Sequence, residues 1–216
     1  MNFGYYNMDC IEGMRKFPDK YFDLAIVDPP YGINGLSKSR PSVLTKYGQL
    51  ETVNDLVPTK EYFDDLFRVS KNQIVWGFNH LSDLLPTTKE YVFWYKHQPV
   101  ASFSDGELAW TSFTKTAKCF DYKFFGAHGK EPHRIHPTQK PVALYTWLLN
   151  TYAKPGDKIL DTHVGSASSL IACHRLGFDY VGFELDPHYY ELSKRRLEQE
   201  QAQLSMFRPE QMAVVR

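Results

Sequence analysis

The chain has 216 residues, of which 43% are apolar and 23% are charged, values that suit a single globular domain with a sizeable core. This composition excludes collagen-like, coiled-coil and disordered chains. The 25 basic and 25 acidic residues balance, so binding to nucleic acid would need a local basic patch rather than net charge.

Membrane and disulfide-stabilised classes are also disfavoured. No apolar stretch approaches the roughly 20 residues that a membrane-spanning helix needs, and the first residues lack a basic region followed by an apolar one. Three widely separated cysteines, Cys10, Cys119 and Cys173, argue against a disulfide framework and against a zinc cluster. We therefore expect a cytoplasmic protein without a membrane segment or a metal site.

Two strands and a long loop are expected in the first part of the chain. The short aromatic segment Tyr5–Asp9 predicts a strand, which leads through a loop at Cys10–Met14 to a second strand at Tyr21–Val27. The second strand is almost continuously apolar, as is typical of strands buried on both faces. Two prolines in Asp28–Gly32 end it. Residues 33–58 lack periodicity and predict a mobile loop, since loops of this length are usually functional or disordered.

The middle of the chain predicts a helix, two strands and an irregular stretch. Apolar residues at helical spacing indicate a helix over Glu61–Val69, and apolar runs indicate strands at Gln73–Trp76 and Tyr91–Tyr95. Residues 96–136 mix aromatic side chains with lysines and histidines, and we expect a small insertion there. A further helix is predicted over Val142–Tyr152, where Pro141 marks its start.

Strands and helices alternate in the last third. Strands are predicted at Lys158–Asp161 and Tyr180–Glu184. A helix opened by Gly165 and Ser166 continues to Leu176, and Asp186-Pro187 begins another that runs to about Gln203. This alternation predicts a parallel sheet layered by helices.

Three predicted strands end in a carboxylate: Asp28, Asp161 and Glu184. Ligands of open α/β sheets bind beyond the carboxyl ends of the strands. The small-residue turn Gly165–Ser169 lets a ligand approach the backbone, and Glu184 is placed to bond two ribose hydroxyls. Phosphate-loop and three-glycine signatures are lacking, so a nucleoside without pyrophosphate fits, as in S-adenosylmethionine. A merely structural turn is an equal alternative at this point.

The tetrapeptide Asp28-Pro29-Pro30-Tyr31 is more specific. The exocyclic amine of a nucleobase is a poor nucleophile because its lone pair is delocalised into the ring. The Asp28 carboxylate and the Pro29 carbonyl can accept its N–H bonds and localise the lone pair toward a methyl sulfonium, while the prolines keep these acceptors rigid. Tyr31 can stack on the base. The alternative is a strand-ending turn with Tyr31 in the core.

Several segments together resemble the β class of DNA amino-methyltransferases. They are Asp9-Cys10, Asp28–Gly32, His136-Pro137-Thr138-Gln139-Lys140-Pro141, Asp161–Ser169 and Phe183–Pro187. The resemblance covers roughly residues 5–35 and 133–200, with the catalytic half before the cofactor half. It implies one methyltransferase domain over residues 1–216 with a circularly permuted Rossmann-like α/β fold, whose mostly parallel sheet carries helices on both faces.

The resemblance also implies roles for individual residues. The target amine would be held by Asp28, Pro29, Pro30 and Tyr31. Within the cofactor site, Asp9 and Cys10 would lie near the adenine, Glu184 on the ribose, and Asp161, Gly165, Thr138 and Lys140 around the methionine end. The full set implied to bind S-adenosylmethionine is Asp9, Cys10, Asp28, Thr138, Lys140, Asp161, Gly165, Ser166, Glu184 and Leu185.

One turn departs from the family pattern Asp-Pro-Phe-x-Gly-Ser-Gly-Thr-Thr. Thr162 and His163 replace the proline and the aromatic residue, and Ala167 replaces the second glycine. Alanine tolerates positive φ poorly, so we expect a tighter or differently shaped turn, with an effect on cofactor affinity more than on the fold. His163 is expected to be a packing substitute rather than a new catalytic group.

A target amine inside the duplex requires the base to be flipped out. Basic side chains in the 33–58 loop and the 96–136 insertion are expected to contact the DNA: Lys38, Arg40, Lys115, Lys118, Lys123, Lys130 and Arg134. For the insertion, a solvated sheet edge protected by lysines is the alternative. The short segment between the two halves favours either loose sequence specificity or a homodimer that shares recognition.

The implied reaction moves a methyl group from S-adenosylmethionine directly to the N6 amine of adenine in double-stranded DNA. Asp rather than Ser at the first position of the tetrapeptide favours adenine over the N4 amine of cytosine. The alternatives are a cytosine-N4 enzyme, a methyltransferase for RNA or a protein amide, and a DNA-binding relative that has lost catalysis.

Overall fold

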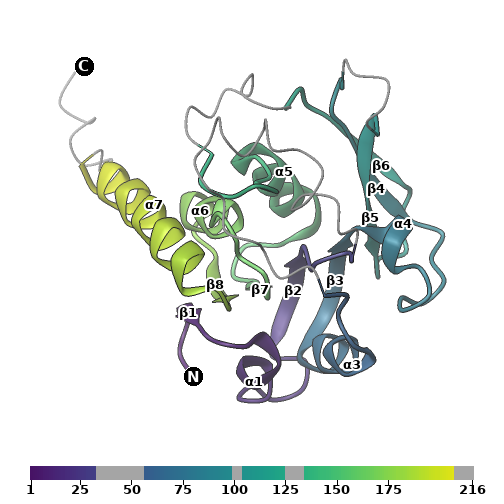
Figure 1. The fold of residues 1–216 in the computed structure, drawn as a ribbon, viewed down its shortest axis with the longest axis horizontal. Coiled ribbons are helices and arrows are strands. Elements are labelled where there is room, and N and C mark those ends of the chain that lie inside the picture. The colour runs from purple at the N-terminus through teal and green to yellow at the C-terminus, as the bar shows by residue number, and fades with distance from the viewer. Residues whose placement is uncertain (33–55, 99–103, 125–133, 207–216) are drawn as a thin grey trace.

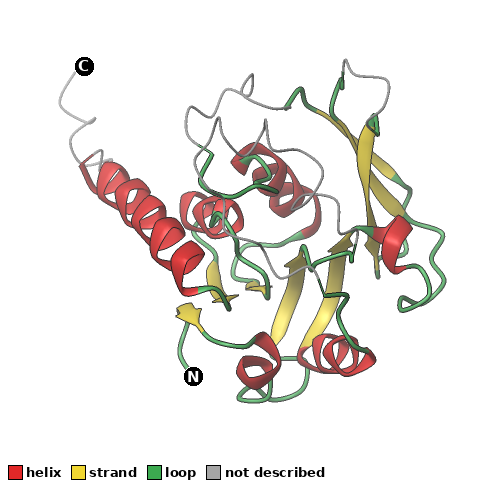
Figure 2. Cartoon of the chain, viewed as in Figure 1, coloured by secondary structure: helices red, strands yellow, loops and turns green. Residues whose placement is uncertain are grey.

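A computed structural model describes residues 1–32, 56–98, 104–124 and 134–206 (Figure 1). Most of the predicted 33–58 loop, up to residue 55, lies outside these residues. The described part of the chain forms one eight-stranded sheet with helices packed against it (Figure 2).

The sheet is mostly parallel, as the sequence predicts. Its order is β1-β8-β7-β2-β3-β5-β4-β6, and every neighbouring pair is parallel except the two pairs that involve β5. The strands are β1 (Gly4–Asn7), β2 (Phe22–Val27), β3 (Ser70–Trp76), β4 (Tyr91–Tyr95), β5 (Gly106–Thr111), β6 (Lys118–Asp121), β7 (Lys158–Asp161) and β8 (Asp179–Glu184).

Helices cover both faces of the sheet. The helices are α1 (Cys10–Met14), α3 (Lys60–Val69), α4 (Phe78–Leu81), α5 (Val142–Tyr152), α6 (Ser168–Leu176) and α7 (Pro187–Met206). α5, α6 and α7 lie on one face, whereas α1 and α3 lie on the other (Figures 1 and 2). Among the described residues, no helix combines the length and apolarity that crossing a bilayer requires.

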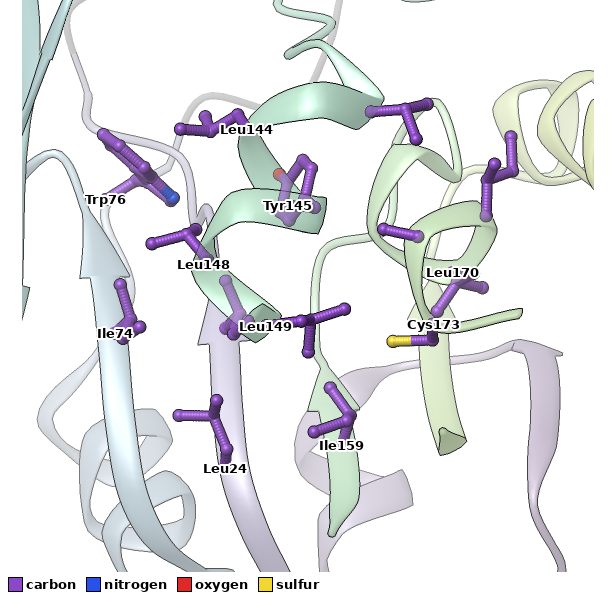
Figure 3. Close-up of a cluster of buried hydrophobic side chains, with 14 of the residues drawn as sticks. Leu24, Ile74, Trp76, Leu144, Tyr145, Leu148, Leu149, Ile159, Leu170 and Cys173 are labelled. Atoms are coloured by element: carbon purple, nitrogen blue, oxygen red, sulfur yellow. The ribbon is translucent and has the colours of Figure 1, made fainter. Parts of the chain in front are cut away.

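The central strand β2 explains this layering. Its side chains alternate between the two faces, so Leu24 and Ile26 join the core beneath α5 and α6, while Ala25 and Val27 join the core beneath α1 and α3. A strand buried on both faces needs consecutive apolar residues, which is the pattern of the last four residues of β2, Leu24–Val27. The first core, drawn in Figure 3, includes Leu24, Ile74, Ile159, Leu148 and Leu149.

Two predictions about local structure are wrong. The expected loop at Cys10–Met14 is the helix α1, because the Asp9 carboxylate accepts hydrogen bonds from the backbone N–H groups of Ile11 (2.8 Å) and Glu12 (3.1 Å) and caps it. The helix expected to open at Gly165 and Ser166 begins at Ser168.

Part of the predicted 96–136 insertion belongs to the main sheet. β5 lies between β3 and β4 and runs antiparallel to both, while β6 extends the sheet at its edge. Residues 99–103 and 125–133 of this stretch lie outside the described ones. The strands β5, β4 and β6 therefore extend the sheet on the side of β3 that faces away from β2.

Candidate active site

The parallel strands bring the predicted acidic residues to one edge of the sheet. β8, β7 and β2 are consecutive neighbours, and Glu184, Asp161 and Asp28 lie at their respective carboxyl ends. The sequence halves meet between β2 and β7, so the Asp28 turn and the Asp161 turn are adjacent. This juxtaposition is the one expected from the strand order of an open α/β sheet.

The Asp28–Tyr31 turn is stabilised by a hydrogen bond inside the turn and by stacking of Tyr31 on a neighbouring ring. The Tyr31 hydroxyl donates a hydrogen bond to Oδ1 of Asp28. Its ring stacks on His80, with the ring centroids 5.5 Å apart and the planes inclined by 16°. Burial, followed by the nearby Asp28 charge, raises the pKa of Tyr31, so the hydroxyl stays protonated and acts as a donor.

Gly77 makes room for the Tyr31 ring. This glycine follows β3 with a φ of +79°, and a Cβ atom placed there would lie 2.1 Å from Cε1 of Tyr31. Any other residue would have to push the ring away or move the backbone. The position of Tyr31 thus depends on a glycine from the neighbouring strand end.

Lys140 reaches the Asp28 turn from the His136–Pro141 loop. Its buried ammonium group forms ion pairs with Asp28 and, at 3.1 Å, with Oε2 of Glu107. Burial lowers the pKa of Lys140, but the charges of Asp28 and Glu107 outweigh this and raise it, so the side chain is cationic. The resemblance implies a place for Lys140 at the methionine end of the cofactor, and in the structure its ammonium contacts Asp28 of the Asp28–Tyr31 turn.

Glu107 is a site residue that the sequence reasoning missed. Its carboxylate forms ion pairs with Lys96 and Lys140. Burial raises the pKa of Glu107, but the two ammonium groups lower it to about 2. The available signal was an acidic residue in a short, otherwise uncharged strand, Gly106–Thr111, but nothing in the sequence identified its partners.

The Asp161 carboxylate is buried and shaped by its own turn. Oδ1 accepts a hydrogen bond from the backbone N–H of His163 at 3.0 Å, and Oδ2 accepts one from the Ser169 hydroxyl. Burial, together with the nearby charges of Asp28 and Glu184, raises the pKa of Asp161 to about 7. Burial and the neighbouring carboxylates therefore both favour the protonated form of Asp161.

Glu184 connects the two turns of the C-terminal half. Oε2 accepts a hydrogen bond from the backbone N–H of Gly165 (2.8 Å), and Oε1 accepts one from that of Asp186 (3.0 Å). Burial raises the pKa of Glu184. Ala167, for which a differently shaped turn was expected, adopts the left-handed conformation itself, with a φ of +60°.

The departures at Thr162 and His163 form a small packed group. The Thr162 hydroxyl lies 2.7 Å from the Tyr62 hydroxyl and 2.9 Å from Nδ1 of His163, whose ring meets Tyr62 edge-on. Burial lowers the pKa of His163 to about 4, so the ring is neutral near pH 7. These contacts are of the packing type expected for His163.

The His136–Pro141 loop packs against the Gly165 turn. The His136 ring lies edge-on to Tyr189, with centroids 4.4 Å apart, and a Cβ atom at Gly165 would be 3.5 Å from it. Nδ1 of His136 lies 3.1 Å from the exposed Thr138 hydroxyl. Burial lowers the pKa of His136 to about 4. The loop therefore brings His136 beside the Gly165 turn and Lys140 beside the Asp28 turn.

The remaining predicted cofactor residues flank the same edge. Asp9 and Cys10 follow β1, which is tied to β8 by a hydrogen bond from the Asn7 side chain to the Glu184 carbonyl (2.8 Å). Burial raises the pKa of Cys10 to about 12, so it is a thiol. Leu185 is exposed next to Glu184, whereas Ser166 is buried.

The predicted DNA-contacting residues are placed in part. Lys115, Lys118 and Lys123 are exposed on or beside the edge strand β6. Arg134 is half-buried, and its guanidinium lies 5.3 Å from the Phe124 ring centroid. Lys38, Arg40 and Lys130 lie outside the described residues. An edge position fits both DNA contact and the protective role of lysines at sheet edges.

Comparison with known proteins identifies one matching family. A family model described as DNA methylase matches residues 58–195, which include the His136–Pro141 loop, Asp161 and Glu184 but not the Asp28–Tyr31 turn. The chain is also 24% identical to the Type II methyltransferase M.HpaI of Haemophilus parainfluenzae, and the match covers 89% of this chain and 73% of that protein.

Solved structures share the fold. The structure of a complex of M1.HpyAVI with SAM matches with a TM-score of 0.62 and 19% identity, over 89% of this chain and 98% of that one. The PvuII DNA methyltransferase, described as cytosine-N4-specific, matches with a TM-score of 0.61 and 14% identity, over 94% and 91% of the two chains. These matches confirm the predicted Rossmann-like methyltransferase fold.

Proposed function

Because the chain belongs to the DNA methylase family whose model matches residues 58–195, we propose that it transfers a methyl group from S-adenosylmethionine to the N6 amine of adenine in double-stranded DNA. Membership confirms the resemblance drawn from the sequence motifs. The adenine specificity and the roles of individual residues are our proposals.

The observation that carries the proposal is the Asp28 carboxylate beside the Asp161–Glu184 edge. Tyr31 and Lys140 each donate to one Asp28 oxygen, and each oxygen keeps acceptor capacity for a further N–H group. The Asp28 carboxylate and the Pro29 carbonyl accept the N–H bonds of the target amine and localise its lone pair. The two prolines and the hydrogen bond from Tyr31 hold these acceptors in place before the substrate arrives.

The residues at this edge fit the cofactor electrostatically. Asp28, Asp161 and Glu184 bring three carboxyl groups to this edge, and the charges of Asp28 and Glu184 add to the effect of burial in raising the pKa of Asp161. A ligand that carries an ammonium group and a sulfonium reduces that repulsion. When bound, S-adenosylmethionine supplies an electrophilic methyl group.

We assign the cofactor contacts by the family pattern and the positions described above. Glu184 is assigned to the ribose hydroxyls, and Asp9, Cys10 and Leu185 to the neighbourhood of the adenine. Asp161, Gly165, Ser166 and Thr138 are assigned to the methionine end. Asp28 lies where this end meets the target amine, and Lys140 contacts Asp28 there.

The choice of adenine rests on the first residue of the tetrapeptide. Asp28 stands where Ser is commoner in cytosine-N4 enzymes. A cytosine-N4 activity is the second candidate, since one matching fold is that of a cytosine-N4-specific enzyme. The two activities differ in product, because one yields N6-methyladenine and the other N4-methylcytosine.

The test is transfer of a labelled methyl group to DNA, followed by digestion and mass spectrometry of the nucleosides. The wild type is expected to yield N6-methyladenine, and Asp28→Ala is expected to yield no label. Asp23→Asn is the control, because Asp23 lies at the opposite end of β2, where it pairs with Lys71. Undiminished labelling by Asp28→Ala would reject the role of Asp28, and N4-methylcytosine as the product would reject the adenine assignment.

A further inference from the structure

The antiparallel strand β5 brings its first residues to the candidate active site. Parallel strands contribute their last residues to the carboxyl edge of a sheet, whereas an antiparallel neighbour contributes its first ones. Trp76 at the end of β3 pairs with Ala109, and the next residue, Gly77, donates a backbone hydrogen bond to Leu108 at 2.9 Å. Glu107 therefore lies just beyond the end of β3, on the side of the Asp28 turn.

Four side chains of alternating charge follow one another from this point. Three ion pairs link them in order: Lys96 with Glu107, Glu107 with Lys140, and Lys140 with Asp28. We term these four side chains the charge chain. Its members come from the end of β4, the start of β5, the His136–Pro141 loop and the end of β2. The Lys140 side chain is the most buried member, at 5% exposure.

Because the Lys140 ammonium group is buried, the partners that it faces determine its orientation. An ammonium group has three donors and no acceptor, and a buried charge that lacks a partner is costly. Aromatic rings enclose this group, with the centroid of Trp76 at 5.5 Å and that of Tyr31 at 6.0 Å. Glu107 and Asp28 are the two carboxylates on either side of it, so Glu107 sets how Lys140 meets Asp28.

We propose that Glu107 is a positioning residue, which holds the Lys140 ammonium against the Asp28 carboxylate and so fixes the oxygens that accept the target amine. The inference rests on the proposed function of Asp28. It adds a residue that lies outside all the motifs on which the family resemblance depends. Lys96 completes the arrangement by balancing the second oxygen of Glu107.

The experiment combines E107Q, K140M and the double variant. E107Q removes the charge at constant size, and K140M removes the ammonium at similar length. With amine acetylation read by mass spectrometry, E107Q is expected to increase modification of Lys140 severalfold, because the ammonium loses a partner. The turnover of methyl transfer is expected to fall by about tenfold to a hundredfold. The KM for the cofactor is expected to stay within about twofold.

The double variant separates positioning from a merely structural role. If Glu107 acts through Lys140, E107Q causes no further loss of turnover in the K140M background. E200Q is the matched control, because Glu200 pairs with Arg175 in the α6–α7 layer, and we expect it to leave both readouts unchanged. Circular dichroism verifies folding, and E107D, which keeps the charge, is expected to be intermediate in both readouts.

Two results would overturn the inference. The first is that Lys140 in folded E107Q is acetylated to the same extent as in the wild type. The second is that the loss of turnover in the double variant equals the product of the losses in the two single variants. If the wild type transfers no methyl group at all, the proposed function fails. The acetylation of Lys140 still decides in that case whether Glu107 holds the ammonium.

Discussion

The backbone N–H of Gly165 donates a hydrogen bond to Oε2 of Glu184 at 2.8 Å, so the last residue of β8 shapes the turn that follows β7. Because the same carboxylate also accepts from Asp186, Glu184 is fixed from two sides. Glu184 thus supports the turn as well as being a candidate ligand for the ribose.

We expect Glu184→Ala to weaken cofactor binding more than Glu184→Gln does. Hydrogen bonds to a charged group contribute about 1.5–3 kcal/mol, so the Ala variant is expected to bind roughly tenfold to a hundredfold more weakly. The Gln variant keeps one acceptor oxygen, and its cofactor affinity is expected to fall between those of the wild type and the Ala variant. Calorimetric titration with S-adenosylmethionine measures both, and wild-type affinity in Glu184→Ala would exclude the ribose assignment.

Gly77→Ala is expected to impair methyl transfer by displacing Tyr31. The added Cβ would lie 2.1 Å from the Tyr31 ring. Gly156→Ala is the matched control, since Gly156 also has a positive φ, +87°, but has no atoms within 4 Å of the added Cβ. Both variants are expected to lose about 1 kcal/mol of stability from backbone strain. Only Gly77→Ala is expected to lose turnover, and equal turnover in the two variants would contradict the role given to Gly77.

The contribution of Asp161 to the stability of the protein is expected to fall as pH rises toward neutrality. Its folded-state pKa of about 7 lies above its ordinary value of 3.8, so between these values the folded state holds a proton that the unfolded state has released. This contribution is complete below pH 4 and is lost as pH rises through 7. Urea unfolding of the wild type and Asp161→Asn from about pH 5 to about pH 8 measures the difference.

We expect the wild type to lose stability relative to Asp161→Asn over that interval. Asp23→Asn is the control. Although burial raises the pKa of Asp23, Lys71 and the backbone N–H of Lys158 lower it in the folded state, and its effect falls at more acidic pH. Asp23→Asn is therefore expected to keep the slope of the wild type. An increase in wild-type stability relative to Asp161→Asn with rising pH would contradict the burial argument for Asp161.

Ala167→Gly is expected to stabilise the protein. A left-handed alanine costs about 1–2 kcal/mol, while glycine raises the entropy of the unfolded chain by about 0.5–1 kcal/mol, so we expect a net gain of roughly 0.5–1 kcal/mol. Ala172→Gly, inside α6, is the control and is expected to lose at least about 1 kcal/mol. Thermal unfolding measures both, and destabilisation by Ala167→Gly would mean that the methyl group contributes more through packing than the strain costs.

Replacing Lys115, Lys118 and Lys123 together by Gln is expected to weaken DNA binding. The slope of log Kd against log salt concentration should fall by about 0.9 for each phosphate that the protein no longer neutralises. A triple Gln variant at Lys16, Lys60 and Lys71, which lie on or next to α1 and α3, controls for the change in net charge. If both triple variants bind DNA equally well, the lysines near β6 serve the sheet edge rather than DNA.

The sequence predicted the parallel part of the fold well because its signals are local. The apolar run Tyr21–Val27 indicated β2, and the alternation after Lys158 indicated β7, α6, β8 and α7. The site acids followed, since strands that run in one direction share a carboxyl edge. The family pattern then supplied the roles, which charge and composition could not supply.

The missed features depend on contacts that sequence spacing does not encode. α1 has five residues, too few for helical periodicity, and it is fixed by the capping carboxylate of Asp9. β5 is antiparallel and enters the sheet between β3 and β4, so the neighbours of Glu107 are set by tertiary pairing. Lys140 was predicted as a site residue, but its contact with Asp28 spans 112 positions.

The order of the strands has a consequence for folding during synthesis. β1 pairs with β8, and β2 pairs with β7, so the earliest strands meet partners from the last third of the chain. Closing such long loops slows folding and leaves unpaired backbone exposed on the nascent chain. The Asp28–Tyr31 turn therefore acquires Asp161 as a neighbour only after β7 has emerged from the ribosome, and we expect ribosome-bound fragments that lack β7 and β8 to depend on chaperones.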